Sequence, residues 1–103
     1  MSQVDVTYFI LDYNPYSDAT AQKNLSLAVQ TTRERYNDAL KADFFLVNQG
    51  AQEPYHRKLL ESLALKYDFH YLDLRTNLGI SRGINFCAQL ARSNIYVLYH
   101  RIV

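Results

Sequence analysis

The chain has one cysteine, Cys87, no tryptophan, two prolines and three glycines. A single cysteine cannot form an internal disulfide, and without a second cysteine or a nearby pair of histidines the sequence offers no structural zinc site. No Pro/Gly/Ser-rich linker and no low-complexity tract divides the chain. We therefore expect a single domain over residues 1–103, without a metal site.

An excess of charge of one sign and long apolar runs are also missing. Eleven lysines and arginines against ten aspartates and glutamates give a net charge of +1, so the chain lacks the basic stripe that nucleic-acid backbones require. No apolar run approaches the ~18 residues of a membrane span, and the first residues do not resemble a signal peptide. The sequence predicts a cytoplasmic protein that neither spans a membrane nor binds nucleic acid.

Apolar strands alternate with amphipathic helices along the chain. We predict strands over residues 4–13, 42–48, 69–74 and 94–100, and helices over about 20–37, from Pro54 to Tyr67, and after residue 79. The third helix is expected to place its apolar side chains on one face: Ile80, Ile84, Cys87, Ala88 and Ala91. The βαβαβαβ order implies parallel strands with right-handed crossovers. We expect an α/β, three-layer, Rossmann-like half-domain with a parallel four-stranded sheet in the order 3-2-1-4, one face of which is under-covered.

Ligands of such sheets bind beyond the carboxyl ends of the strands, at the switch point of the connections. The segment "NLGISRGIN", residues 77–85, lies there and holds two of the three glycines. Gly79 could take a positive φ, the helix starting near Ser81 would point free N–H groups at an anion, and Arg82 could bind a phosphate. In the alternative interpretation Gly79 only makes a turn, Gly83 permits close helix packing, and Arg82 is solvated.

Three motifs in order resemble the amino-terminal half of a family 2 glycosyltransferase. They are Tyr13-Asn14 after the first strand, "VNQGA" at the end of the second, and Asn77-x-Gly79-x-x-x-Gly83-x-Asn85 before the last helix and "IYVLY". The resemblance covers nearly the whole chain. It implies a GT-A fold, of which this half binds a nucleotide sugar, most often a uridine diphosphate sugar. By resemblance, the nucleotide-binding residues are Leu11, Tyr13, Asn14, Asn48, Asn77, Gly79, Arg82 and Asn85.

Two features depart from the family pattern. Asn48 stands where the family usually has an aspartate that accepts a hydrogen bond from uracil, and an amide can also donate. Where the family has an Asp-x-Asp motif that holds Mn²⁺ or Mg²⁺, the chain reads "YVLYHRIV", which supplies no carboxylate for such hard cations. The chain therefore resembles a glycosyltransferase truncated before its metal motif and acceptor domain. We expect no catalytic residue, a metal only in a full-length relative, and little or no transfer by this chain alone.

A second function remains open, that of a non-catalytic α/β module for interaction or oligomerisation. An exposed last strand and an under-covered sheet face would both favour a homodimer.

Three single residues also have competing interpretations. Asp12 could contact a ribose hydroxyl, or equally a turn or helix end. His56 is expected to begin an exposed helix and to be structural or solvated, and Cys87 is expected to be a core residue rather than a reactive thiol.

Overall fold

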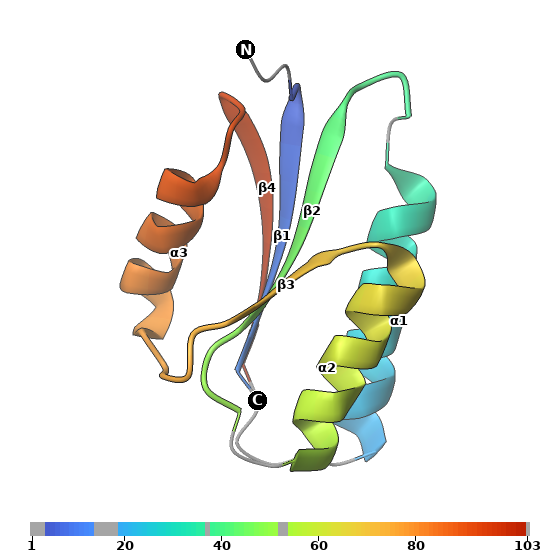
Figure 1. Cartoon of the computed structure of the whole chain (residues 1–103), viewed down its shortest axis with the longest axis vertical. Helices are drawn as coiled ribbons and strands as arrows, with labels where there is room; N and C mark the ends of the chain where they lie inside the picture. The colour runs from blue at the N-terminus through green and yellow to red at the C-terminus, as the bar shows by residue number, and fades with distance from the viewer. Residues whose placement is uncertain (1–3, 14–18, 37, 52–53, 103) are drawn as a thin grey trace.

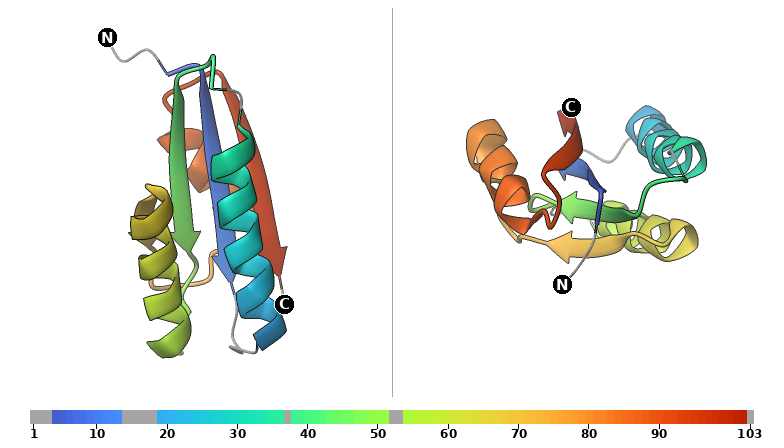
Figure 2. Two further views of the ribbon diagram at one scale, coloured as in Figure 1. Left: turned by 90° about the vertical axis from the view of Figure 1, so that its right-hand side faces the viewer. Right: turned by 90° about the horizontal axis from the view of Figure 1, so that it is seen from above.

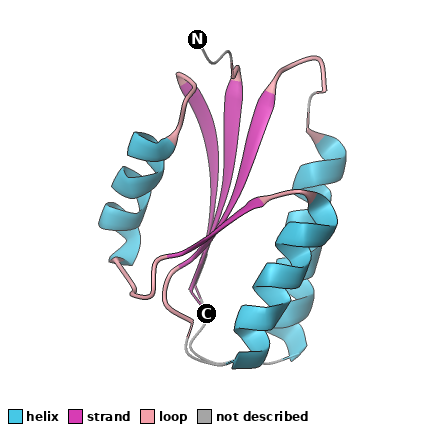
Figure 3. Ribbon diagram, viewed as in Figure 1, coloured by secondary structure: helices cyan, strands magenta, loops and turns pink. Residues whose placement is uncertain are grey.

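The computed structural model describes residues 4–13, 19–36, 38–51 and 54–102. Strands and helices alternate through the chain, as the sequence predicts (Figure 1 and Figure 3). The elements are β1 (Val6–Tyr13), α1 (Ala19–Arg35), β2 (Ala42–Asn48), α2 (Pro54–Tyr67), β3 (His70–Asp73), α3 (Gly79–Leu90) and β4 (Ile95–Ile102).

The four strands form one parallel sheet in the order β3-β2-β1-β4. The central strand β1 pairs with β2 from Val6↔Ala42 to Asp12↔Asn48, and with β4 from Val6 to Tyr13. Its run of β-branched and aromatic residues suits a strand that is covered on both faces. The predicted α/β fold, with its parallel sheet and strand order 3-2-1-4, is confirmed.

Helices cover the two faces of the sheet unequally. Helices α1 and α2 lie on one face and α3 lies alone on the other, which makes three layers (Figure 2). The larger core cluster, which includes Ile10, Leu25, Leu46 and Leu60, lies between the sheet and the helix pair. A smaller cluster of Phe9, Leu11, Val47 and Cys87 lies between the sheet and α3.

Several predicted element boundaries differ from the structure. Helix α1 ends at Arg35 rather than at residue 37. Strand β3 is shorter than predicted, because the Phe69 N–H donates to Ala64 O at 2.9 Å and so closes α2 instead of joining the sheet. Strand β4 extends two residues further, to Ile102. The expected apolar face of α3 was too wide, because Ala88 is exposed beside the buried Cys87.

Candidate functional site

The end of β1 is hydrogen-bonded to the segment after β2, and the end of β2 to the segment after β3, at the carboxyl edge, the edge of the sheet where the parallel strands end. The Gln49 N–H donates to Asp12 O, and the Leu74 N–H donates to Asn48 O, both at 2.9 Å. The Leu78 N–H donates to the side-chain oxygen Oε1 of Gln49 at 3.1 Å. The end of β2 therefore connects β1, β3 and the start of α3.

A buried carboxylate–imidazole pair joins β1 to α2 at this edge. Asp12 Oδ2 lies 2.8 Å from His56 Nε2, and the two residues are 1% and 0% exposed. Of the two interpretations of Asp12, the structure shows the contact with a helix end. The expectation that His56 is exposed is wrong, because the first turn of α2 packs beneath the sheet edge and turns this side chain inward.

Two of the predicted nucleotide-binding residues are buried in the protein. Leu11 is part of the core cluster beneath α3. The side-chain oxygen of Asn48 accepts from the Ala51 N–H at 2.8 Å, and its amide nitrogen donates to the Tyr71 hydroxyl at 3.0 Å. Asn48 is fully buried, so a ligand could bond to its amide only in exchange for these contacts. Burial raises the pKa of the Tyr71 phenol, against the opposing effect of the bond from Asn48.

Four other predicted residues lie along the start of α3 and its outer surface. Asn77, Arg82 and Asn85 are exposed. The Asn77 side-chain oxygen accepts from the Gly79 N–H at 2.9 Å, which forms a turn before the helix. Gly79 has φ +80°, and a Cβ added there would meet nothing within 4 Å. The positive φ expected for Gly79 is therefore confirmed, whereas contact of these residues with a ligand stays a prediction.

Gly83 lets α3 approach the carboxyl edge closely. A Cβ at this position would lie 2.8 Å from Leu11 Cδ2 and 3.2 Å from Gln49 Oε1, so no larger residue fits without displacing them. The Gln49 amide nitrogen is buried without a hydrogen-bond partner among the residues that the structure describes. Gln49 therefore holds the start of α3 through its oxygen alone. The close helix packing considered for Gly83 is confirmed.

The remaining predicted positions are at the end of β1. Tyr13 is the last residue of this strand, but its side chain and the whole of Asn14 lie outside the described part of the structure.

A cavity of about 430 Å³ opens at the carboxyl edge, between the ends of β2 and β3 and the first turn of α2. We call it the arginine cavity, and it is lined by Gly50, Ala51, Arg57, Asp73 and Arg75. Arg57 Nη2 lies 3.2 Å from Asp73 Oδ2, and the Arg75 N–H donates to Asp73 Oδ1 at 2.9 Å. Asp73 thus accepts from one guanidinium group, that of Arg57, and from the backbone of Arg75. With two arginines and one aspartate, the named lining residues carry an excess of positive charge.

Backbone geometry brings the walls of the arginine cavity together. Gly50 has φ +79°, and a Cβ there would lie 2.9 Å from the backbone of Thr76, so only glycine fits between the two loops. Arg75 has φ +60°, an uncommon conformation for a residue with a side chain. A non-glycine residue held in this way often marks a functional site.

None of Arg57, Asp73 and Arg75 was among the residues predicted from the sequence to bind a ligand. What they share in the sequence is their position near the ends of strands. Arg57 lies in the first turn of α2, which follows β2, and Asp73 and Arg75 lie at the end of β3 and just after it. Among the residues that the structure describes, the lining of the arginine cavity includes none of the predicted nucleotide-binding residues.

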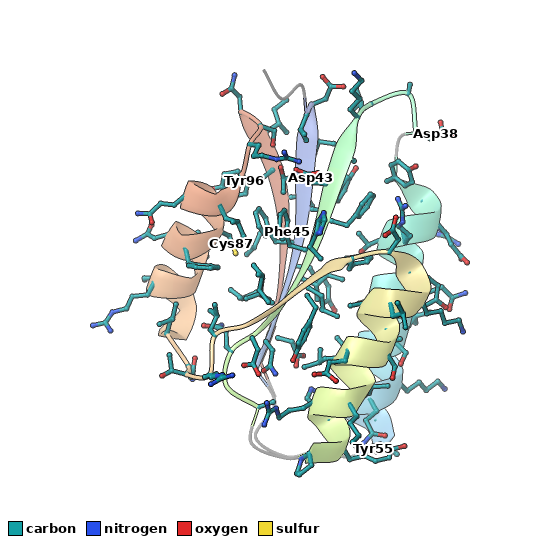
Figure 4. All side chains as sticks on the ribbon, viewed as in Figure 1. Asp38, Asp43, Phe45, Tyr55, Cys87 and Tyr96 are labelled. Atoms are coloured by element: carbon teal, nitrogen blue, oxygen red, sulfur yellow. The ribbon has the colours of Figure 1, made fainter. Side chains whose placement is uncertain are left out.

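The single cysteine, Cys87, is buried in the core. Burial raises the pKa of Cys87 to about 11, so the thiol stays protonated at neutral pH and its expected core role is confirmed (Figure 4). Across residues 4–13, 19–36, 38–51 and 54–102, no group of three or more His, Cys, Asp or Glu side chains could hold a metal ion. The described helices are also too short or too polar to cross a membrane.

Comparisons with known proteins do not assign this site. No protein-family model matches the chain, and no curated protein and no solved structure matches it significantly.

Proposed function

We propose that the chain binds a nucleoside diphosphate sugar at the carboxyl edge, with uridine diphosphate as the expected nucleotide part and the arginine cavity as the site of its charged groups. The proposal concerns binding and not transfer. It rests on the resemblance of the sequence motifs to family 2 glycosyltransferases, and on the polar cavity found at the edge where ligands of such sheets bind. A cytoplasmic location is part of the same proposal.

The observation that carries the proposal is the presence of two arginines, Arg57 and Arg75, beside Asp73 in the lining of one cavity. Guanidinium groups bind phosphate oxygens through two parallel N–H donors, and the bond is strengthened by the opposite charges. Asp73 keeps acceptor capacity for ribose or sugar hydroxyls, because a carboxylate offers about four lone-pair positions. The cavity volume, about 430 Å³, lies within the ~300–1,000 Å³ common for small-molecule sites.

The predicted residues along α3 would border the same ligand from the other side. Arg82 is exposed near the helix start, where the free N–H groups of the first turn also favour negative charge. Leu11 and Asn48 would act indirectly, by supporting α3 and the end of β2. In this arrangement the nucleotide extends along the carboxyl edge from the arginine cavity toward α3.

A thermal-shift series tests the proposal. The protein is titrated with uridine, guanosine and cytidine diphosphates, each with and without Mn²⁺. A ligand that binds only the folded state raises the melting temperature, by the equivalent of ~2.7 kcal/mol at a hundredfold excess over the dissociation constant. We expect one diphosphate, that of uridine, to stabilise the protein. No shift with any nucleotide would refute the proposed function.

Variants then locate the site. Arg57→Ala and Arg75→Ala should remove the stabilisation, and Arg82→Ala should weaken it. The matched control is Lys58→Ala, which removes a positive charge from the next position of the same exposed helix turn without altering the cavity lining. If Arg82→Ala removed binding while both cavity variants kept it, the arginine cavity would not be the site.

A further inference from the structure

The two edges of the sheet differ in length and in protection. The β3 edge has four residues, and its Asp73 bonds to Arg57 and to the Arg75 backbone. The β4 edge has eight residues. All eight pair with β1 in one uninterrupted register, from Ile95 opposite Val6 onward. On its outer side no other described strand pairs with β4, so β4 presents a long, regular edge that another strand could pair with.

The exposed side chains of β4 do not protect this edge. Natural edge strands avoid association through charged residues, prolines, bulges or short length. From Ile95 to Tyr99 the strand contains no charged residue and no proline, and the uninterrupted register shows no bulge. Its large apolar side chains are exposed: Ile95, Tyr96, Val97 and Tyr99.

Both faces of β4 carry apolar contact surface. Because side chains alternate along a strand, Tyr96 (labelled in Figure 4) and Leu98 lie on the face that α3 covers. Tyr96 packs edge-on to Phe9, with ring centroids 6.1 Å apart. Val97 and Tyr99 face the other way and line a groove of about 280 Å³ beside α1. A strand added at this edge would therefore find apolar neighbours on both faces.

We propose that β4 pairs antiparallel with β4 of a second copy of this chain, so that one sheet continues through a two-fold symmetric dimer. A two-fold axis perpendicular to the sheet keeps like faces together and makes one residue face its own copy, either Leu98 or Tyr99. With Leu98 at the centre, Val97 of each copy lies opposite Tyr99 of the other, a β-branched and aromatic pair that favours strand pairing. Arg101 then lies opposite Ile95, so no like charges meet.

A second copy suits this edge for two further reasons. The same apolar strand is present in both partners, so the surface complements itself under two-fold symmetry. The net charge of each chain is only +1, so long-range repulsion between copies is weak. The other edge strand, β3, has only four residues, half the length of β4.

The size of the contact sets the expected strength. Eight residues at ~3.3 Å each give an edge ~26 Å long, which with its flanking side chains buries roughly 300 Å² per copy. Stable interfaces bury ~800 Å² per partner, and smaller ones belong to weak or transient complexes. We therefore expect the dissociation constant of the dimer to be micromolar or higher, so the assays must extend to high protein concentration.

Sedimentation velocity tests the dimer. The weight-average sedimentation coefficient should rise from the monomer to the dimer value between about 1 μM and 1 mM, the range expected for such a small contact. Val97→Lys places a charge at the edge and should keep the protein monomeric throughout. Leu65→Lys, at a residue of α2 that is 87% exposed and remote from the edge, is the control and should dimerise normally. A monomer at every concentration, or a dimer unchanged by Val97→Lys, would overturn the proposal.

Disulfide trapping is a second test, which captures the dimer rather than preventing its formation. Opposed residues of antiparallel strands have Cα atoms ~4.5–5.5 Å apart, within the range of a disulfide. Leu98→Cys or Tyr99→Cys should therefore form a covalent dimer under mild oxidation, and the one that does so identifies the register. The native Cys87 will not interfere because it is buried. Leu65→Cys measures random collision, and trapping no faster than in this control would also overturn the proposal.

Discussion

Removing the imidazole of His56 should strongly destabilise the fold. In the His56→Ala variant, Asp12 loses the Nε2 group that lies 2.8 Å from its Oδ2. Asp12 is only 1% exposed, so its carboxylate cannot recover the lost interaction from water without opening the edge where β1 meets α2. The variant therefore leaves a buried acid without this partner, and also leaves the space that the ring had filled.

The magnitude follows from the burial of both partners. Removing one partner of a buried pair that contains a carboxylate costs ~3–5 kcal/mol. The total free energy of unfolding of a domain is only ~5–15 kcal/mol. We expect a loss of about 3 kcal/mol or more, which for a chain of this size corresponds to a fall in melting temperature on the order of 12 °C or more. The variant should fold only marginally at 37 °C.

Urea unfolding followed by circular dichroism provides the measurement. The His56→Ala, Asp12→Ala and double variants form a mutant cycle, in which the double variant should lose less than the sum of the single losses, by about 1 kcal/mol or more. Lys58→Ala, an exposed change on the same helix, should alter stability by less than ~0.5 kcal/mol. If His56→Ala cost less than 1 kcal/mol and the cycle were additive, the pair would contribute no stability and our reasoning would be refuted.

Three further predictions concern packing and pH. Gly50→Ala should cost at least about 2 kcal/mol in urea unfolding and clearly more than Gly79→Ala, because both glycines have positive φ but only Gly50 lacks room for a Cβ; equal losses would contradict this. Stability should fall as the pH rises from about 9 to about 11, because unfolded chains lose the Cys87 proton before the folded chain does; Cys87→Ala should reduce that slope, and an unchanged slope would count against the burial effect. Arg92→Ala should cost on the order of 1–3 kcal/mol in thermal unfolding, because Arg92 donates three hydrogen bonds at 2.8–3.0 Å to the largely buried Asp43, and a neutral result would show that water replaces the arginine.

The fold could be predicted from the sequence because its signals are local and repeat along the chain. The apolar run 42–48 gave the exact bounds of β2, and alternating strands and helices leave few possible topologies once crossovers are taken as right-handed. Boundaries were less certain where tertiary contacts decide them. Phe69 has the character of a strand residue, yet its N–H bonds to the end of α2 and its ring packs in the core.

The candidate site was less predictable because it depends on how separate elements meet. Arg57 and Asp73 are sixteen residues apart, and only the packing of α2 against β3 brings them together. His56 occupies a helix start that the sequence suggests is exposed, and no local pattern reveals that this turn lies under the sheet edge. Asn48, by contrast, was correctly placed at the end of β2, but the sequence could not show that its amide is bonded within the protein.

The position of β1 at the centre of the sheet has a consequence for the order of folding during synthesis. One neighbour, β2, follows about thirty residues after β1, whereas the other, β4, pairs Ile95 with Val6 and is made far later than β2. Ribosomes add roughly 5–20 residues per second, so the apolar edge of β1 stays unpaired for several seconds after β2 has emerged. Parallel strands joined over such distances form slowly and expose surface to aggregation. Newly made chains should therefore be prone to aggregation until β4 has emerged to pair with the second edge of β1.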